Sequence, residues 1–128
     1  MVVDASALIA ILRAEPEDAL FAGLLYDATV RIMSPVNWFE AAMNTEKRSM
    51  SDFTALEKLA AHLDLKIVPV DEVQMRLAHE AWRRFGKGRH PAKLNLGDCF
   101  AYALAKRSGE PLLYKGGDFA HTDVTAAV

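Results

Sequence analysis

The sequence predicts one α/β domain of three layers over residues 1–128, in which about six helices cover a central parallel sheet of four to five strands. Short apolar runs alternate along the chain with segments of helical periodicity. This alternation is typical of crossover connections between parallel strands. The 128 residues are 52% hydrophobic and 25% charged. The chain is therefore long and apolar enough to bury one core unaided.

The predicted strands are the short apolar runs. They are Met1–Val3, Val30–Met33, Lys66–Val70 and Pro111–Tyr114, with a fifth, shorter fragment around Val124. Parallel sheets of this kind bind ligands beyond the carboxyl ends of their strands. We therefore expect functional residues where these runs end.

The predicted helices are the segments in which apolar residues recur at helical spacing. They are Ser6–Arg13, Pro16–Tyr26, Pro35–Arg48, Asp52–His62, Asp71–Arg84 and Leu96–Ser108. We expect Ser34, Ser51 and Asn95 to cap the third, fourth and sixth of them. Gly109 should close the last helix.

Composition and charge exclude several classes of protein. The single cysteine, Cys99, excludes an internal disulfide and a zinc site built from cysteines. Residues 1–82 carry 13 acidic and 7 basic side chains, whereas residues 83–128 carry 4 and 8. The basic excess is concentrated in residues 83–93, where we expect any contact with a polyanion.

The opening segment shows no targeting signal. The apolar residues 5–12 are too few to span a bilayer, and no basic leader precedes them. We therefore expect a cytoplasmic protein without a membrane partner.

Two aspartates each follow a predicted strand. Asp4 ends the first apolar run, and Asp118 follows the run that ends at Tyr114 after a glycine pair. Both would lie at the ligand-binding edge of the sheet. A helix N-cap at Asp4 and an ordinary turn at Asp118 are the structural alternatives.

Glu40 interrupts an apolar stripe. Helical spacing puts it on one face with Val36, Phe39 and Met43. A buried carboxylate is costly unless it is paired or binds a metal, so this position favours a functional role. The alternative is a glutamate at the edge of the stripe that reaches water. Asn44, one turn further on, is a candidate to orient it.

Asp98 is the only acid of the sixth predicted helix and lies in its first turn. The alternative to a functional role is a capping box formed by Asn95 and Asp98. Gly97 has no side chain, so a ligand or another part of the chain can approach closely there.

Carboxylates that converge need a cation, because like charges raise one another's pKa. Mg²⁺ accepts oxygen ligands and a few carboxylates. One or two such ions activate water and stabilise an in-line displacement at a phosphodiester. Acids at strand and helix ends, together with a basic loop, therefore favour a metal-dependent nuclease.

Three stretches of the sequence and one further residue resemble the PIN-domain ribonucleases, and in particular the VapC toxins of bacterial type II toxin–antitoxin systems. They are residues 2–8 (VVDASAL), Glu40, residues 85–105 (FGKGRHPAKLNLGDCFAYALA) and residues 112–119 (LLYKGGDF). The resemblance implies a PIN-like fold with an acidic, catalytic pocket that binds Mg²⁺ or Mn²⁺. By this resemblance, the four acids of the pocket are Asp4, Glu40, Asp98 and Asp118.

The same resemblance implies the activity and the partners. It implies an endoribonuclease toxin that cleaves single-stranded RNA, commonly transfer RNA, with metal-activated water. It also implies a homodimer and a cognate VapB-type antitoxin that covers the pocket. Ser6 is the hydroxyl residue beside the first acid, and Gly117 stands where many members carry Asp or Asn.

The basic segment and Ser6 supply the expected RNA contacts. Lys87 and Arg89 are suited to phosphate oxygens, Arg89 through its planar guanidinium. Arg83 and Arg84 need no ligand, because a helix C-terminus favours positive charge.

Two other functions are considered. A phosphoacceptor receiver domain has a similar length, an acidic Mg²⁺ pocket and a lysine near its last strand, here Lys115. It needs paired acids after the first strand, where this chain has Asp4 and Ala5, and an acceptor aspartate after the third strand, where Asp71 instead resembles the cap of the next helix. The other alternative is a catalytically inactive binding partner with PIN architecture.

Overall fold

The computed structural model describes all residues, 1–128, and contains one sheet of four parallel strands. These are β1 (Val2–Val3), β2 (Ile32–Met33), β3 (Lys66–Ile67) and β4 (Leu112–Leu113), in the order β3-β2-β1-β4. The predicted α/β fold is confirmed. The expected fifth fragment contributes a single parallel bridge, between Leu112 and Ala126.

Six helices surround the sheet. They are α1 (Ala5–Leu12), α2 (Asp18–Asp27), α3 (Pro35–Arg48), α4 (Met50–His62), α5 (Glu72–Phe85) and α6 (Leu96–Ser108), and a short 3-10 helix η1 spans Asp118–His121. Ser34 and Asn95 cap α3 and α6 as predicted, and Gly109 closes α6 in the left-handed conformation, with φ 71°.

The predicted start of α4 was wrong. Ser49, and not Ser51, is its cap: the Ser49 hydroxyl accepts a hydrogen bond from the Asp52 backbone N–H at 3.0 Å. Ser49 also ends α3 in an extended conformation, with φ −169° and ψ 156°. Ser49 is therefore the only residue between the two helices.

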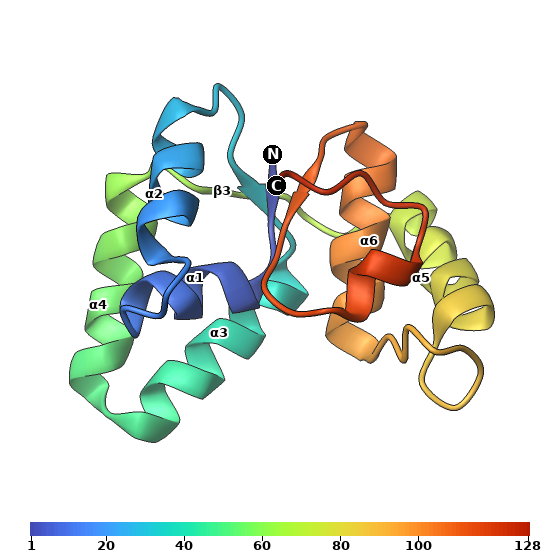
Figure 1. Ribbon diagram of the computed structural model, residues 1–128, viewed down its shortest axis with the longest axis horizontal. Helices are drawn as coiled ribbons and strands as arrows, with labels where there is room; N and C mark the ends of the chain where they lie inside the picture. Colours follow the sequence, from blue (N-terminus) through green and yellow to red (C-terminus); the bar gives the residue numbers. More distant parts are fainter.

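Successive strand residues point to opposite faces of the sheet and separate two halves of the core. Val2 and Leu112 pack with α5 and α6. Val3 and Leu113 pack with the helices α1 to α4. Figure 1 shows these groups on either side of the sheet, which is the predicted three-layer arrangement.

The layers meet at the carboxyl edge of the sheet. Asp4 follows β1 at this edge and begins α1, while α3 crosses from its own layer to contact α6. The first turns of α1 and α6 and the middle of α3 are thereby brought together. None of the helices has the length and apolar character needed to cross a membrane.

Candidate active site

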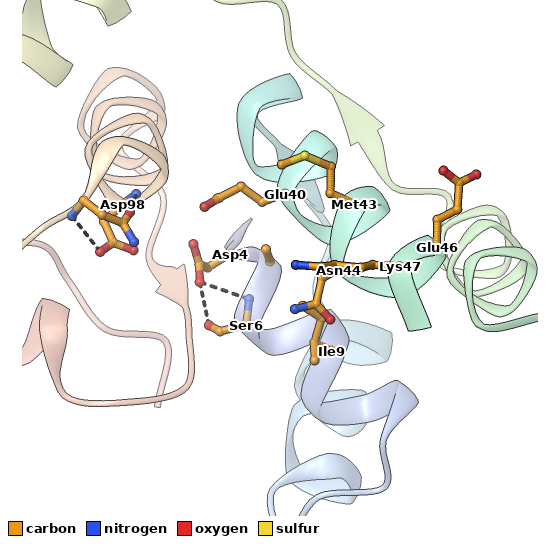
Figure 2. Close-up of a pocket in the computed structure, with 11 residues that line it drawn as sticks. Asp4, Ser6, Ile9, Glu40, Met43, Asn44, Glu46, Lys47 and Asp98 are labelled. Carbon is orange, nitrogen blue, oxygen red and sulfur yellow. Dashed lines mark hydrogen bonds between the residues drawn. The ribbon is translucent and has the colours of Figure 1, made fainter. Parts of the chain in front are cut away.

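An open pocket of about 790 Å³ lies where α1, α3 and α6 meet. Its lining includes the carboxylates of Asp4, Glu40 and Asp98. Figure 2 shows these three side chains pointing toward one another from three separate elements. The structure therefore brings together three of the four acids that the sequence analysis predicted for the pocket.

Asp4 has two roles at once. Its Oδ2 accepts a hydrogen bond from the Ser6 backbone N–H at 3.1 Å, which caps α1, and another from the Ser6 hydroxyl at 2.5 Å. The residue is only 6% exposed. Burial raises the pKa of Asp4, and the bonds from Ser6 oppose that rise. The N-cap alternative and the functional interpretation are thus compatible.

Asp98 also combines a cap with a place in the pocket. Its Oδ2 accepts from the Asn95 backbone N–H at 3.1 Å, and the Asn95 side chain accepts from the Asp98 N–H at 2.9 Å. The expected capping box is present. Burial, followed by the charges of Asp4, Asp118 and Glu40, raises the pKa of Asp98 to about 7.

The sequence argument for Glu40 assigned the wrong buried face to α3. Phe39 and Met43, its supposed stripe, are 61% and 50% exposed. The buried face runs through Asn37, Ala41 and Thr45. Glu40 is half-buried because its carboxylate lies against Gly97 in the first turn of α6.

Asn37, and not Asn44, orients Glu40. The Asn37 amide Nδ2 donates to Glu40 Oε1 at 3.0 Å and to the Gly97 carbonyl at 2.9 Å. Asn44 instead accepts from Arg13. Sequence reasoning missed Asn37, although its place one turn before Glu40 on the same helix is a usable signal.

The close approach expected at Gly97 is made by Glu40. A Cβ atom built on Gly97 would lie 2.1 Å from Glu40 Oε1 and 2.2 Å from Oε2. Only glycine therefore accommodates the Glu40 carboxylate in this position.

Asp118 stands apart from the other three acids. It is the exposed first residue of η1 and does not line the pocket. Its charge nevertheless contributes to the raised pKa of Asp4 and of Asp98. No three acidic, histidine or cysteine side chains lie close enough together to hold a metal ion jointly.

The chemistry of the donor set fits a hard divalent cation. The pocket offers carboxylate oxygens from Asp4, Glu40 and Asp98, and each of these groups has a raised pKa to which a neighbouring carboxylate contributes. Mg²⁺ is usually held by one or two carboxylates and keeps several waters. A cation at this position would offset the repulsion between the acids.

Along the chain, the basic loop directly precedes a residue that lines the pocket. Residues 86–94 lead directly into Asn95, the cap of α6. Lys87 and Arg89 are exposed and do not line the pocket itself. The Arg89 guanidinium stacks over the Trp82 ring, 4.3 Å from its centroid.

Comparison with known proteins shows close relatives over the whole chain. Residues 1–124 match the PIN domain family. The chain is 47% identical over 127 residues to "Ribonuclease VapC" of Mycolicibacterium smegmatis, covering 98% of each chain. It is 45% identical over 130 residues to "Ribonuclease VapC28" of Mycobacterium tuberculosis, covering 100% of this chain and 98% of the relative.

Solved structures share the fold at lower sequence identity. The sarcin-ricin loop cleaving toxin VapC20 of Mycobacterium tuberculosis aligns with a TM-score of 0.77 at 17% identity, over 97% of this chain and 95% of that chain. A chain of a toxin-antitoxin complex from Klebsiella pneumoniae aligns with a TM-score of 0.73 at 17% identity, over 99% and 97%.

Proposed function

This chain belongs to the PIN-domain family, among the VapC ribonucleases, and we propose that it is a toxin endoribonuclease whose catalytic site is the pocket of Asp4, Glu40 and Asp98. The observation that carries the site assignment is the convergence of these carboxylates from three elements on one open pocket. Family membership and the names of the close relatives support the activity.

We propose that Asp4 and Asp98 hold a Mg²⁺ or Mn²⁺ ion, with Glu40 binding a water molecule of that ion or accepting a proton from it. Such an ion, when bound, activates water and stabilises charge on the phosphate. The protein's own contribution is positional. Ser6 fixes one oxygen of Asp4, and the Asn95 N–H fixes one oxygen of Asp98. The other oxygen of each carboxylate is not engaged by these bonds.

Asp118 is proposed as the fourth acid. Its charge contributes to the raised pKa of Asp4 and of Asp98, which supports a place near the pocket.

RNA and protein partners follow from the same family membership. We propose that the substrate is single-stranded RNA, with transfer RNA as the first class to test, and that Ser6, Lys87 and Arg89 contact it. A VapB-type antitoxin and a second copy of the chain are the proposed protein partners, and the cytoplasm is the proposed location. The relative found in a toxin-antitoxin complex supports an antitoxin partner.

The structure does not favour the receiver alternative, because Asp71 is placed away from the acidic pocket. Asp71 caps α5 by accepting from the Gln74 N–H at 2.8 Å and pairs with Arg107. It does not line the acidic pocket. Asp71, the aspartate considered as the acceptor for this function, is therefore a helix cap outside the acidic pocket.

The experiment that tests the proposal is cleavage of single-stranded RNA by the purified protein with Mg²⁺ or Mn²⁺, with and without EDTA. We expect cleavage that EDTA stops and that Asp4→Asn and Asp98→Asn each reduce at least about a hundredfold, as for loss of a catalytic group. Glu57→Gln, an exposed acid on α4, is the matched control and should cleave normally. A folded protein that cuts no RNA under these conditions favours the inactive binding partner instead.

A further inference from the structure

We propose that Asn37 is a positioning residue, whose buried carboxamide holds the Glu40 carboxylate against the backbone of α6 and so sets its place relative to Asp98. This inference rests on the proposed function, because it concerns the same pocket. It assigns a role to a residue that lies outside the pocket lining and contacts the cation or RNA only through Glu40.

The orientation of the Asn37 amide is determined by its neighbours. Its nitrogen lies 3.0 Å from Glu40 Oε1 and 2.9 Å from the Gly97 carbonyl oxygen. Both neighbours are hydrogen-bond acceptors, so the opposite orientation would place oxygen against oxygen. Both N–H groups of the amide are therefore used, one on α3 and one on α6.

The other half of the amide has no partner. Asn37 is fully buried, and its Oδ1 accepts no hydrogen bond. A buried, unsatisfied carbonyl destabilises the folded protein. An apolar side chain of similar size would avoid that cost. We therefore infer that asparagine is favoured at this position because its nitrogen bonds both Glu40 and the Gly97 carbonyl.

The position of Glu40 depends on two features: the hydrogen bond from Asn37, and the space beside Gly97. The absent Cβ of Gly97 leaves the space that the Glu40 carboxylate occupies. Asp98 is the next residue along α6, so the same contact sets the spacing between two of the three pocket acids. With Oε1 engaged by Asn37, Glu40 Oε2 is left for a cation or its water.

The test compares two buried amides. Gln74 on α5 is also buried, with 2% of its surface exposed, and its Oε1 is likewise without a partner. It donates to the Pro69 carbonyl at 3.1 Å, away from the pocket. Asn37→Leu and Gln74→Leu therefore remove matched groups, of which only one contacts Glu40. The readouts are Mn²⁺ affinity, from the electron paramagnetic resonance signal of the free ion, and thermal stability.

We expect Asn37→Leu to bind Mn²⁺ about tenfold or more weakly, the usual effect of losing a group that orients a ligand, with a melting temperature equal to or above that of the wild type. Gln74→Leu should bind Mn²⁺ normally. In the Glu40→Gln background, Asn37→Leu should cause little further loss, because it acts through Glu40. Independent, multiplicative losses, or wild-type affinity in Asn37→Leu, would overturn the inference.

A second variant decides the matter if Asn37→Leu does not fold. Gly97→Ala displaces the Glu40 carboxylate without changing Asn37, and alanine favours a helix over glycine. We expect a stable protein with similarly weakened Mn²⁺ binding, and unchanged affinity would count against the proposal. If the wild type binds no Mn²⁺, the proposed metal site fails and this inference with it. If Asp4→Asn loses binding while Asn37→Leu and Gly97→Ala keep it, only this inference fails.

Discussion

Asp4 and Ser6 are joined by two hydrogen bonds to a single carboxylate oxygen, one from the Ser6 backbone N–H and one from its hydroxyl. The Ser6 hydroxyl oxygen in turn accepts the Lys115 backbone N–H at 3.0 Å. Because that donor occupies one side of the oxygen, the hydroxyl proton is directed to Asp4. The first acid is thereby tied to the segment after β4, which leads to Asp118.

This arrangement predicts that Ser6→Ala lowers RNA cleavage by about tenfold to a hundredfold, the range usual for groups that orient metal ligands. The loss follows because one oxygen of Asp4 loses its hydroxyl donor and the Lys115 N–H loses its acceptor. Ser6→Thr keeps the hydroxyl and should retain most activity. Initial cleavage rates at saturating Mg²⁺ provide the measurement. Equal rates for Ser6→Ala and the wild type would show that the hydroxyl has no part in positioning Asp4.

The raised pKa of Asp98, about 7, predicts how the metal-free protein responds to pH. The folded protein binds this proton more tightly than the unfolded chain, whose aspartates titrate near pH 3.9. Stability should therefore fall as pH rises from about 4 through 7. Asp4 and Glu40 have pKa values raised in the same direction and add to this trend.

Urea unfolding in EDTA at several pH values between 5 and 8 measures this dependence. The variant Asp98→Asn should show a weaker dependence on pH, since one of the responsible groups is removed. A wild-type protein that becomes more stable as pH rises over this interval would contradict the burial of these carboxylates.

The basic loop predicts a salt-dependent contact with RNA. Lys87→Ala combined with Arg89→Ala should weaken binding of single-stranded RNA and reduce the slope of log affinity against log salt by about 1 to 2, because each phosphate contact releases counterions. Lys58→Ala, an exposed lysine of α4, is the control and should leave the slope unchanged. Fluorescence anisotropy with Asp4→Asn protein, which should not cut the probe, gives the affinities. An unaltered slope in the double variant would place the RNA elsewhere.

Substitutions of two aspartates near the C-terminus are predicted to have opposite effects: one lowers activity alone, and the other lowers stability alone. Asp118 makes no hydrogen bond that supports the fold, so Asp118→Asn should lower cleavage and leave the melting temperature unchanged. Asp123 accepts from the Tyr102 hydroxyl at 2.6 Å and from Lys106 Nζ at 3.2 Å. Asp123→Asn should therefore cost about 1 kcal/mol of stability and keep the cleavage rate.

Melting curves and cleavage rates of the two variants, recorded side by side, check this contrast. If Asp118→Asn cleaves RNA as fast as the wild type, Asp118 has no role as a fourth acid.

The order of strands and helices was predictable because it depends on local patterns. The apolar runs ending at Asp4 and Tyr114, the helical periodicity and the caps at Ser34 and Asn95 are each encoded within a few residues. The start of α4 was missed because Ser49 and Ser51 are equally good caps in isolation. Which one serves depends on where α3 ends.

The candidate site was predictable only in part. Asp4 and Asp98 follow from their places at a strand end and in a first helical turn, which are properties of the sequence. Glu40 was chosen for a stripe that proved to be exposed, so the residue was identified while its surroundings were not. The side of α3 that is buried is decided by its contacts with α1, α4 and α6, which no periodicity along α3 itself reveals.

The amino-acid sequence by itself determined the α/β class, the acids available for chemistry and the resemblance that identifies the family, because these depend on residue type and short spacing. Tertiary structure alone decided that Asn37 reaches Gly97, 60 positions away, and that Asp118 stays outside the pocket. Contacts of this kind arise where separate helices pack, and their geometry is set by every side chain at the interface rather than by the local chain.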